Sequence, residues 1–189
     1  MMSIRRSADP LSLMAQRLAT NARGVALIEF AFVLPVLFLI YIGSFQLCDA
    51  IAAQRQLALT TRAISDMTTQ NVDVTDATLG NILGASTMTM SPYPASSMTA
   101  TISQIYIDPT GVAKVTWSKG YNTTSLPKNN IYHLTSGVYA NNTYIIIATT
   151  HYDYVPNMSG SYLGTIPMND SVVMFARDSA SINCADCTN

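Results

Sequence analysis

Charged side chains are scarce in this sequence. Asp, Glu, Lys and Arg make up 11% of the 189 residues, hydrophobic residues make up 49%, and the formal net charge is −1. A nucleic-acid interface needs clustered Lys and Arg, so no nucleic-acid partner is expected. Residues 30–47 contain no Asp, Glu, Lys, Arg or His. Because about twenty apolar residues span a bilayer, the sequence predicts a transmembrane helix over residues 25–47.

Cysteine is also rare, with three residues, too few for the disulfide framework of a small secreted domain. Cys184 and Cys187 have the spacing for a local disulfide if this end of the chain lies outside the cytoplasm. The alternative is a pair of free thiols on a C-terminal tail. A C-x-x-C also occurs in redox and zinc sites, but there is no second cysteine pair here, so we expect no metal and no cofactor.

No catalytic motif is present. The two histidines, His133 and His151, have no cysteine near them in sequence, and only Asp153 lies close to His151. The G-x-S-x-G nucleophile motif is absent. A Ser-His-Asp triad assembles only in space, so the sequence leaves that arrangement open. We expect a protein that is not an enzyme.

The few charges are distributed unevenly about the apolar run. Residues 1–24 carry four arginines against one aspartate, a net charge of +3, whereas residues 25–189 carry a net charge of −4. The positive-inside rule therefore predicts a basic cytoplasmic leader over residues 1–24 and places the chain beyond Leu47 in the periplasm. The expected localisation is the inner membrane, crossed once.

Residues 48–97 are predicted to form a periplasmic helical region. No Gly or Pro occurs from Cys48 to Gln70, so one helix of more than 40 residues is expected to run from the membrane into the periplasm. Pro35 is expected to kink it. A second, short helix should begin at a Thr75 or Asp76 N-cap and stop at Gly84.

Residues 98–189 are rich in Thr, Tyr, Val and Ile and are predicted to form a periplasmic β-rich domain. The expected fold class is α+β, a long helix followed by a small antiparallel sheet. His151 and Asp153 alternate with Tyr152 and Tyr154, which predicts a sheet with one solvated face. The tyrosines either fill this sheet or form an exposed adhesive stripe. The expected strands are 98–108 and 112–118, joined by a Pro-Thr-Gly turn, then 143–155 and 171–183.

The stretch RGVALIEFAFVLP holds the only glutamate of the protein inside its most apolar segment. Gly24 stands between the basic leader and the apolar helix, and Glu29 and Phe30 follow five and six residues later. This junction resembles the processing site of type IV prepilins. Together with Leu34-Pro35 and the helical tract that ends at Ser65-Asp66-Met67, it resembles the N-terminal signature of the TadE-like family of the tight-adherence pilus system.

The resemblance implies that a membrane aspartyl peptidase cuts between Gly24 and Val25. It implies a minor pilin or pseudopilin whose partners are other pilin subunits, the prepilin peptidase, the pilus secretion apparatus and the inner membrane. Val25 and Glu29 are separated by one helical turn and share a face. The family assigns Glu29 and Phe30 to subunit alignment, with the carboxylate of Glu29 pairing with the free N-terminus of a neighbouring subunit.

Four alternatives remain at this level. Glu29 is close enough to Arg23 to pair with it at the headgroups of the membrane. Small residues before Ala53 also fit an ordinary signal peptide, although the apolar run is longer than such peptides have. Finally, the chain could be an uncleaved, membrane-anchored binding or adhesive module of the periplasm, or a periplasmic redox or hydrolytic enzyme.

Overall fold

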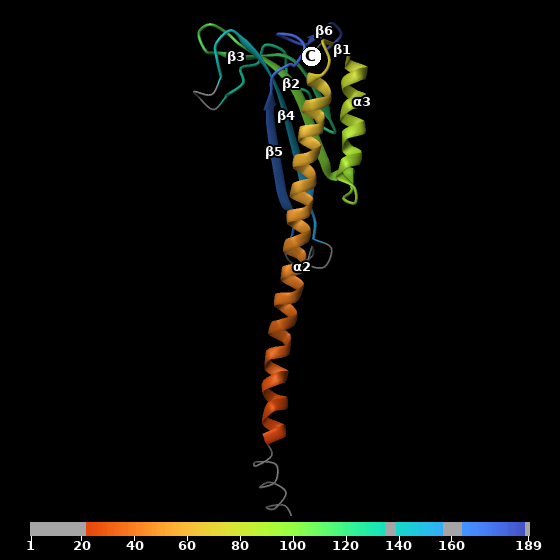
Figure 1. Ribbon diagram of the computed structural model, residues 1–189, viewed down its shortest axis with the longest axis vertical. Coiled ribbons are helices and arrows are strands. Elements are labelled where there is room, and N and C mark those ends of the chain that lie inside the picture. Colours follow the sequence, from red (N-terminus) through yellow and green to blue (C-terminus); the bar gives the residue numbers. More distant parts are fainter. Residues whose placement is uncertain (1–21, 135–138, 157–163, 188–189) are drawn as a thin grey trace, which may run out of the picture. The chain divides into compact units, whose positions relative to one another are not determined.

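A computed structural model describes residues 22–134, 139–156 and 164–187, and it divides the chain into two compact units, Met1–Leu47 and Cys48–Asn189. The first helix of the described chain, α2, covers Ala22–Thr69 and belongs to both units (Figure 1). Its 48 residues confirm the expectation of one helix longer than 40 residues. The basic leader lies almost wholly outside the described residues.

The N-terminal unit consists, where described, of the first half of α2. Its apolar side chains are exposed, and Phe32 and Leu39 keep 76% and 72% of their surface. By length and composition this helix is able to cross a membrane. Pro35 lies inside the helix, where its ring leaves one backbone carbonyl without its usual donor. The kink at Pro35 stays a prediction.

The C-terminal unit is built on a four-stranded antiparallel sheet with the strand order β3-β2-β4-β5. A second, two-stranded sheet pairs β1 with β6 in parallel. This arrangement confirms the α+β class. The strands are β1 Asp73–Val74, β2 Met98–Ile107, β3 Ala113–Tyr121, β4 Thr143–Tyr154, β5 Ile166–Met174 and β6 Asn183–Cys184.

The hairpin between β2 and β3 forms where the sequence predicts it. The Asp108 carboxylate accepts hydrogen bonds from the Thr110 hydroxyl and from the backbone N–H groups of Thr110 and Val112. These bonds hold the pKa of Asp108 below its usual value. Gly111 has φ of +85°, which only glycine adopts at little cost. The turn chemistry is therefore local, and this is why the sequence alone could locate it.

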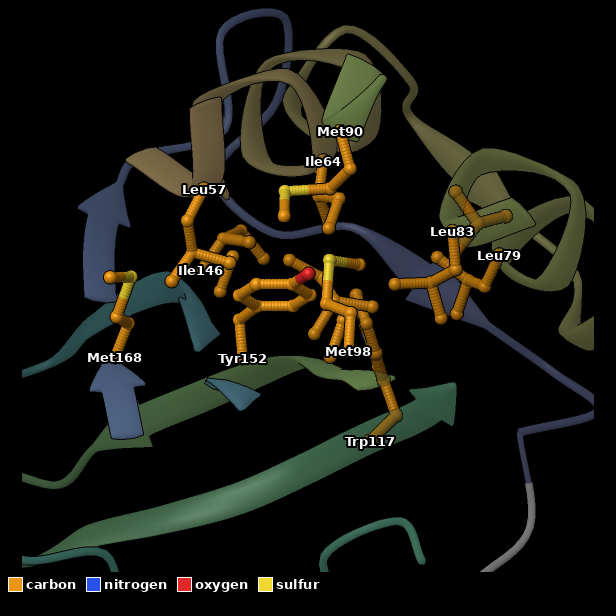
Figure 2. Packing of buried hydrophobic residues seen from close by; sticks show 14 of the residues in the cluster. Leu57, Ile64, Leu79, Leu83, Met90, Met98, Trp117, Ile146, Tyr152 and Met168 are labelled. Atoms are coloured by element: carbon orange, nitrogen blue, oxygen red, sulfur yellow. The ribbon is translucent and has the colours of Figure 1, made fainter. Parts of the chain in front are cut away.

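The core of the C-terminal unit lies between the sheet and two helices, the second half of α2 and α3 (Asp76–Thr87). In Figure 2, Leu57 and Ile64 from α2 and Leu79 and Leu83 from α3 point toward the sheet. They meet the side chains of Met98, Trp117, Ile146 and Tyr152. One face of the sheet is thus covered by both helices.

The alternation in β4 divides its side chains between two faces. Tyr152 and Tyr154 are 2% and 3% exposed in the core, whereas Asp153 is exposed and His151 is half-buried on the other face. The predicted solvated face is confirmed at this end of the sheet. Toward the other end, the same face carries a second apolar cluster made of Ile105, Ile107, Ala113, Ile145 and Ile147.

The predicted end of the short helix is wrong. The short helix α3 does not stop at Gly84 but continues to Thr87, because Ser86 and Thr87 are buried and hold its last turn against the core. Of the two predicted N-caps, Thr75 is the one observed, since its hydroxyl accepts a hydrogen bond from the N–H of Thr78.

The fourth strand is displaced from the predicted 171–183. The strand β5 pairs with β4 from Ile166 and ends at Met174. After it, the N–H of Arg177 donates to the carbonyl of Thr69, and the Arg177 guanidinium pairs with Asp66. These contacts with the end of α2 draw the chain away from β4. They join residues more than 100 positions apart, which the local pattern of β-forming residues does not reveal.

Candidate processing and assembly site

The predicted site occupies the first turns of α2 in the N-terminal unit. Val25 and Phe30 keep 55% and 59% of their surface, and Glu29 is also exposed. Val25 and Glu29 are four residues apart in the helix, which corresponds to an axial rise of about 6 Å. The helix therefore brings Val25 and Glu29 to one face, as the sequence predicts, and leaves both side chains accessible.

Gly24 has no structural role among the described residues. A Cβ atom placed on it would meet nothing within 4 Å, and its backbone is not in the left-handed region. Glycine inside a helix costs about 1 kcal/mol relative to alanine. Neither packing nor turn geometry in the described chain requires a glycine at this position.

Comparison with known proteins gives one result at this segment. Residues 24–65 match the family of TadE-like proteins. The N-terminal segment is TadE-like. The match begins at Gly24 and ends within α2, so it does not cover the sheet of the C-terminal unit. No curated protein and no solved structure gives a significant match.

The TadE-like match confirms the family resemblance and relates the chain to the tight-adherence pilus. TadE-like proteins are structural components and not enzymes. The match, together with the apolar first half of α2, indicates a membrane anchor. Cleavage after Gly24 and the roles of Glu29 and Phe30 stay predictions.

A polar cluster around Asp49, at the start of the C-terminal unit, was not predicted from the sequence. The two carboxylate oxygens of Asp49 accept hydrogen bonds from the hydroxyls of Tyr93 and Tyr154, at 2.8 and 2.6 Å. The two rings meet edge to face with centroids 6.2 Å apart. The cluster ties α2 to the end of β4 and to the loop before β2. The feature of the sequence that could have indicated this cluster is the position of Asp49 directly after an apolar run, without a cationic residue within five positions.

The tyrosines of this cluster should titrate at unusually high pH. Burial, followed by the hydrogen bond to Asp49, raises the pKa of Tyr93 from 10.0 to about 12, and the same causes raise the pKa of Tyr154. Because the pKa of Tyr93 is higher in the folded state than in the unfolded state, the protonated phenol stabilises the fold. This contribution is fully present at pH values below the unfolded pKa of 10.0 and is lost as the pH rises through about 12. The C-terminal unit should therefore become less stable across this interval.

Ultraviolet absorbance of phenolate measures this titration. Asp49→Asn removes the negative charge beside both phenols, so we expect the two highest tyrosine transitions to move to lower pH. Tyr41→Phe, a substitution in the N-terminal unit, is the control and should leave these transitions in place. Unchanged high-pH transitions in Asp49→Asn would show that Asp49 does not act on the two tyrosines.

The C-terminal cysteines lie far from the TadE-like segment in sequence. Cys184 and Cys187 form a disulfide, and Cys187 is buried in the core. The Asp186 carboxylate accepts a hydrogen bond from the N–H of Asp76 in the first turn of α3, where a negative charge is favourable. Cys184, Asp186 and Cys187 bring their ligand-type atoms within 4.8 Å, but the disulfide occupies both sulfurs. The disulfide-closed segment Cys184–Cys187 is thus held against the N-terminus of α3 by the hydrogen bond of Asp186.

The histidines do not gather a catalytic set among the described residues. His151 contacts the side-chain oxygen of Asn169 through Nδ1 at 2.8 Å, and its Nε2 lies 3.3 Å from Asp153. His133 is exposed on the loop after β3. Neither histidine has a nucleophilic side chain among these contacts.

Proposed function

We propose that this chain is the precursor of a minor pilin or pseudopilin of the tight-adherence pilus, processed between Gly24 and Val25. The observation that carries the proposal is the TadE-like match, which begins at the glycine before the predicted cut. Gly24, which the described fold does not require, is then a residue that the prepilin peptidase recognises. The C-terminal unit stays in the periplasm and presents the surface for other subunits.

Cleavage changes the electrostatics of the helix. It creates an α-ammonium on Val25, one turn from the Glu29 carboxylate. It also removes Arg23 with the leader, so Arg23 is no longer available to Glu29 in the mature chain. A carboxylate at membrane depth costs about 2.5–3.5 kcal/mol on insertion scales and is normally paired. The free partner of Glu29 is then the N-terminus of a neighbouring subunit.

Assembly follows from the same two groups. The apolar side chains of the first half of α2 are exposed in the single chain and become covered when helices of several subunits pack together. Apolar packing alone tolerates sliding by a helical turn. A single carboxylate that must meet a single ammonium permits one register. Glu29 is therefore the group that sets the axial position of each subunit.

Intact-mass measurement and N-terminal sequencing of the membrane-extracted protein test the proposal. We expect a mature chain that begins at Val25 in cells with a prepilin peptidase and at Met1 in cells without one. A chain beginning at Met1 in both would support the uncleaved membrane-anchored module. A chain beginning at Ala53 would show removal by a signal peptidase.

Gly43 provides a matched control for the glycine. Like Gly24, it lies in α2, and a Cβ on it would meet nothing within 4 Å. Gly24→Val should block cleavage, whereas Gly43→Val should leave it intact. Equal processing of both variants would contradict the role of Gly24.

A further inference from the structure

Among the described residues, the sheet of the C-terminal unit has one covered edge and one open edge. Along the outer edge of β3, backbone hydrogen bonds join Val115 to Asn129 and Asn130, and Ala113 to Tyr132. Along the outer edge of β5, no backbone hydrogen bond to another segment occurs within residues 22–134, 139–156 and 164–187. An open edge of nine residues is a template for a further strand.

One hydrogen bond shows which residues of β5 direct their backbone N–H and C=O groups toward the open edge. The carbonyl of Asn169 accepts a hydrogen bond from the Gln54 side chain at 3.3 Å, so the backbone groups of Asn169 point away from β4. In an antiparallel strand every second residue points the same way. Pro167, which has no N–H, and Ser171 therefore also face the open edge, and Asp170 faces β4 with its backbone groups.

Asp170 is the unusual side chain of β5. It is opposite Thr150, whose hydroxyl contacts Thr61 of α2 at 2.6 Å, so Asp170 lies on the helix-covered face of the sheet. It is half-buried, and its Oδ2 atom is buried without a hydrogen-bond partner. None of the ion pairs in the described part of the chain includes Asp170. A half-buried carboxylate without a cation favours a partner that supplies one.

The position of Asp170 also decides which strand can dock. Asp170 is the central residue of Ile166–Met174. If β5 paired with β5 of a second copy along its whole length, antiparallel and about a two-fold axis, Asp170 would face Asp170. That pair would be of the non-hydrogen-bonded type, with Cα atoms about 4.5 Å apart, where like charges repel most. Asp170 therefore opposes self-pairing.

We propose that the open edge of β5 is a docking site for a strand of a different protein that carries Lys or Arg opposite Asp170. The incoming strand would pair antiparallel with the edge-facing groups of Asn169, Ser171 and Val173. Its cationic residue would neutralise Asp170, and charge complementarity would thereby select a heterologous partner over a second copy. This surface is distinct from the TadE-like segment, and the proposal does not depend on cleavage after Gly24.

A variant of this protein with lysine in place of Asp170 can serve as the cationic partner strand in a test. Wild-type full-length protein is mixed in detergent with isotope-labelled Asp170→Lys protein, and native mass spectrometry counts the dimers. The introduced lysine would repel its own copy but attract the Asp170 carboxylate of the wild-type chain, so we expect heterodimers about tenfold above the statistical proportion. Asp178→Lys makes the same charge change at an exposed residue outside β5 and should give no enrichment.

The edge itself is tested by Ser171→Pro, which removes one edge-facing N–H, the group that Pro167 lacks naturally. Adding it to either partner should abolish the enrichment. A statistical mixture, an absence of dimers, or heterodimers insensitive to Ser171→Pro would overturn the proposal.

If Asp170→Lys does not fold by circular dichroism, Asp170→Asn replaces it. Removal of the repulsion should then permit self-association that Ser171→Pro blocks. A variant Asp170→Asn that folds and remains monomeric would overturn the proposal equally.

Discussion

Replacing Glu29 by glutamine is expected to leave membrane insertion intact and to abolish incorporation into a pilus or a pilin complex. Glutamine keeps the size of the side chain and removes its charge, so insertion becomes easier. The pairing with a neighbouring N-terminus is lost. If that pairing offsets the insertion cost of about 2.5–3.5 kcal/mol, its loss lowers the equilibrium for incorporation roughly a hundredfold.

Immunoblots of sheared pili and of crosslinked membrane complexes measure incorporation, and carbonate extraction measures insertion. Ser44→Ala is the control within the same helix. The Ser44 hydroxyl donates to the Ile40 carbonyl of its own helix at 2.7 Å, so its removal should not affect neighbours. Normal incorporation of Glu29→Gln would mean that the carboxylate does not align subunits.

Leu57→Ala is expected to have the largest effect on the stability of the C-terminal unit. Leu57 is fully buried on α2 and packs over the sheet in Figure 2. Truncating a leucine in such a site costs about 2–5 kcal/mol, because the methyl groups leave a cavity that neighbours fill only in part. For a domain of ordinary stability this is a large fraction of the total.

Leu59→Ala is the matched control, two residues further along the same helix. Leu59 keeps 50% of its surface, so its truncation should change stability by no more than about 0.5 kcal/mol. Urea unfolding in detergent, followed by fluorescence of Trp117, reports on the C-terminal unit alone, since this protein has a single tryptophan. Equal loss in both variants would contradict the packing of α2 against the sheet.

The elements that the sequence predicted well depend on neighbours within about ten positions. The hairpin β2–β3 is closed by Asp108 and Gly111, and the start of α3 is set by Thr75. The second half of the long helix α2 follows from good helix formers, with no Gly or Pro from Cys48 to Gln70. Errors appear where a distant contact overrides the local pattern, as when Arg177 pairs with Asp66 and ends the run of β-forming residues.

For the candidate site, the residues themselves were readable but their surroundings were not. Gly24, Val25 and Glu29 are recognised by their spacing, and their placement on one helix follows directly. That Gly24 is unconstrained by packing became visible only in three dimensions. The cluster of Asp49 with Tyr93 and Tyr154 was missed, because its partners are 44 and 105 positions away.

The sequence by itself determined the apolar span, the basic flank, the TadE-like junction and the fold class, because each depends on composition or on short spacing along the chain. Tertiary structure alone decided which edge of the sheet stays open and that Asp170 lies on its helix-covered face without a cation among the described residues. An edge is defined by the absence of a pairing strand, and a register by hydrogen bonds between distant segments. The sequence of β5 alone specifies neither its position at the edge of the sheet nor its register. The proposed partner surface could therefore be located only from the tertiary structure.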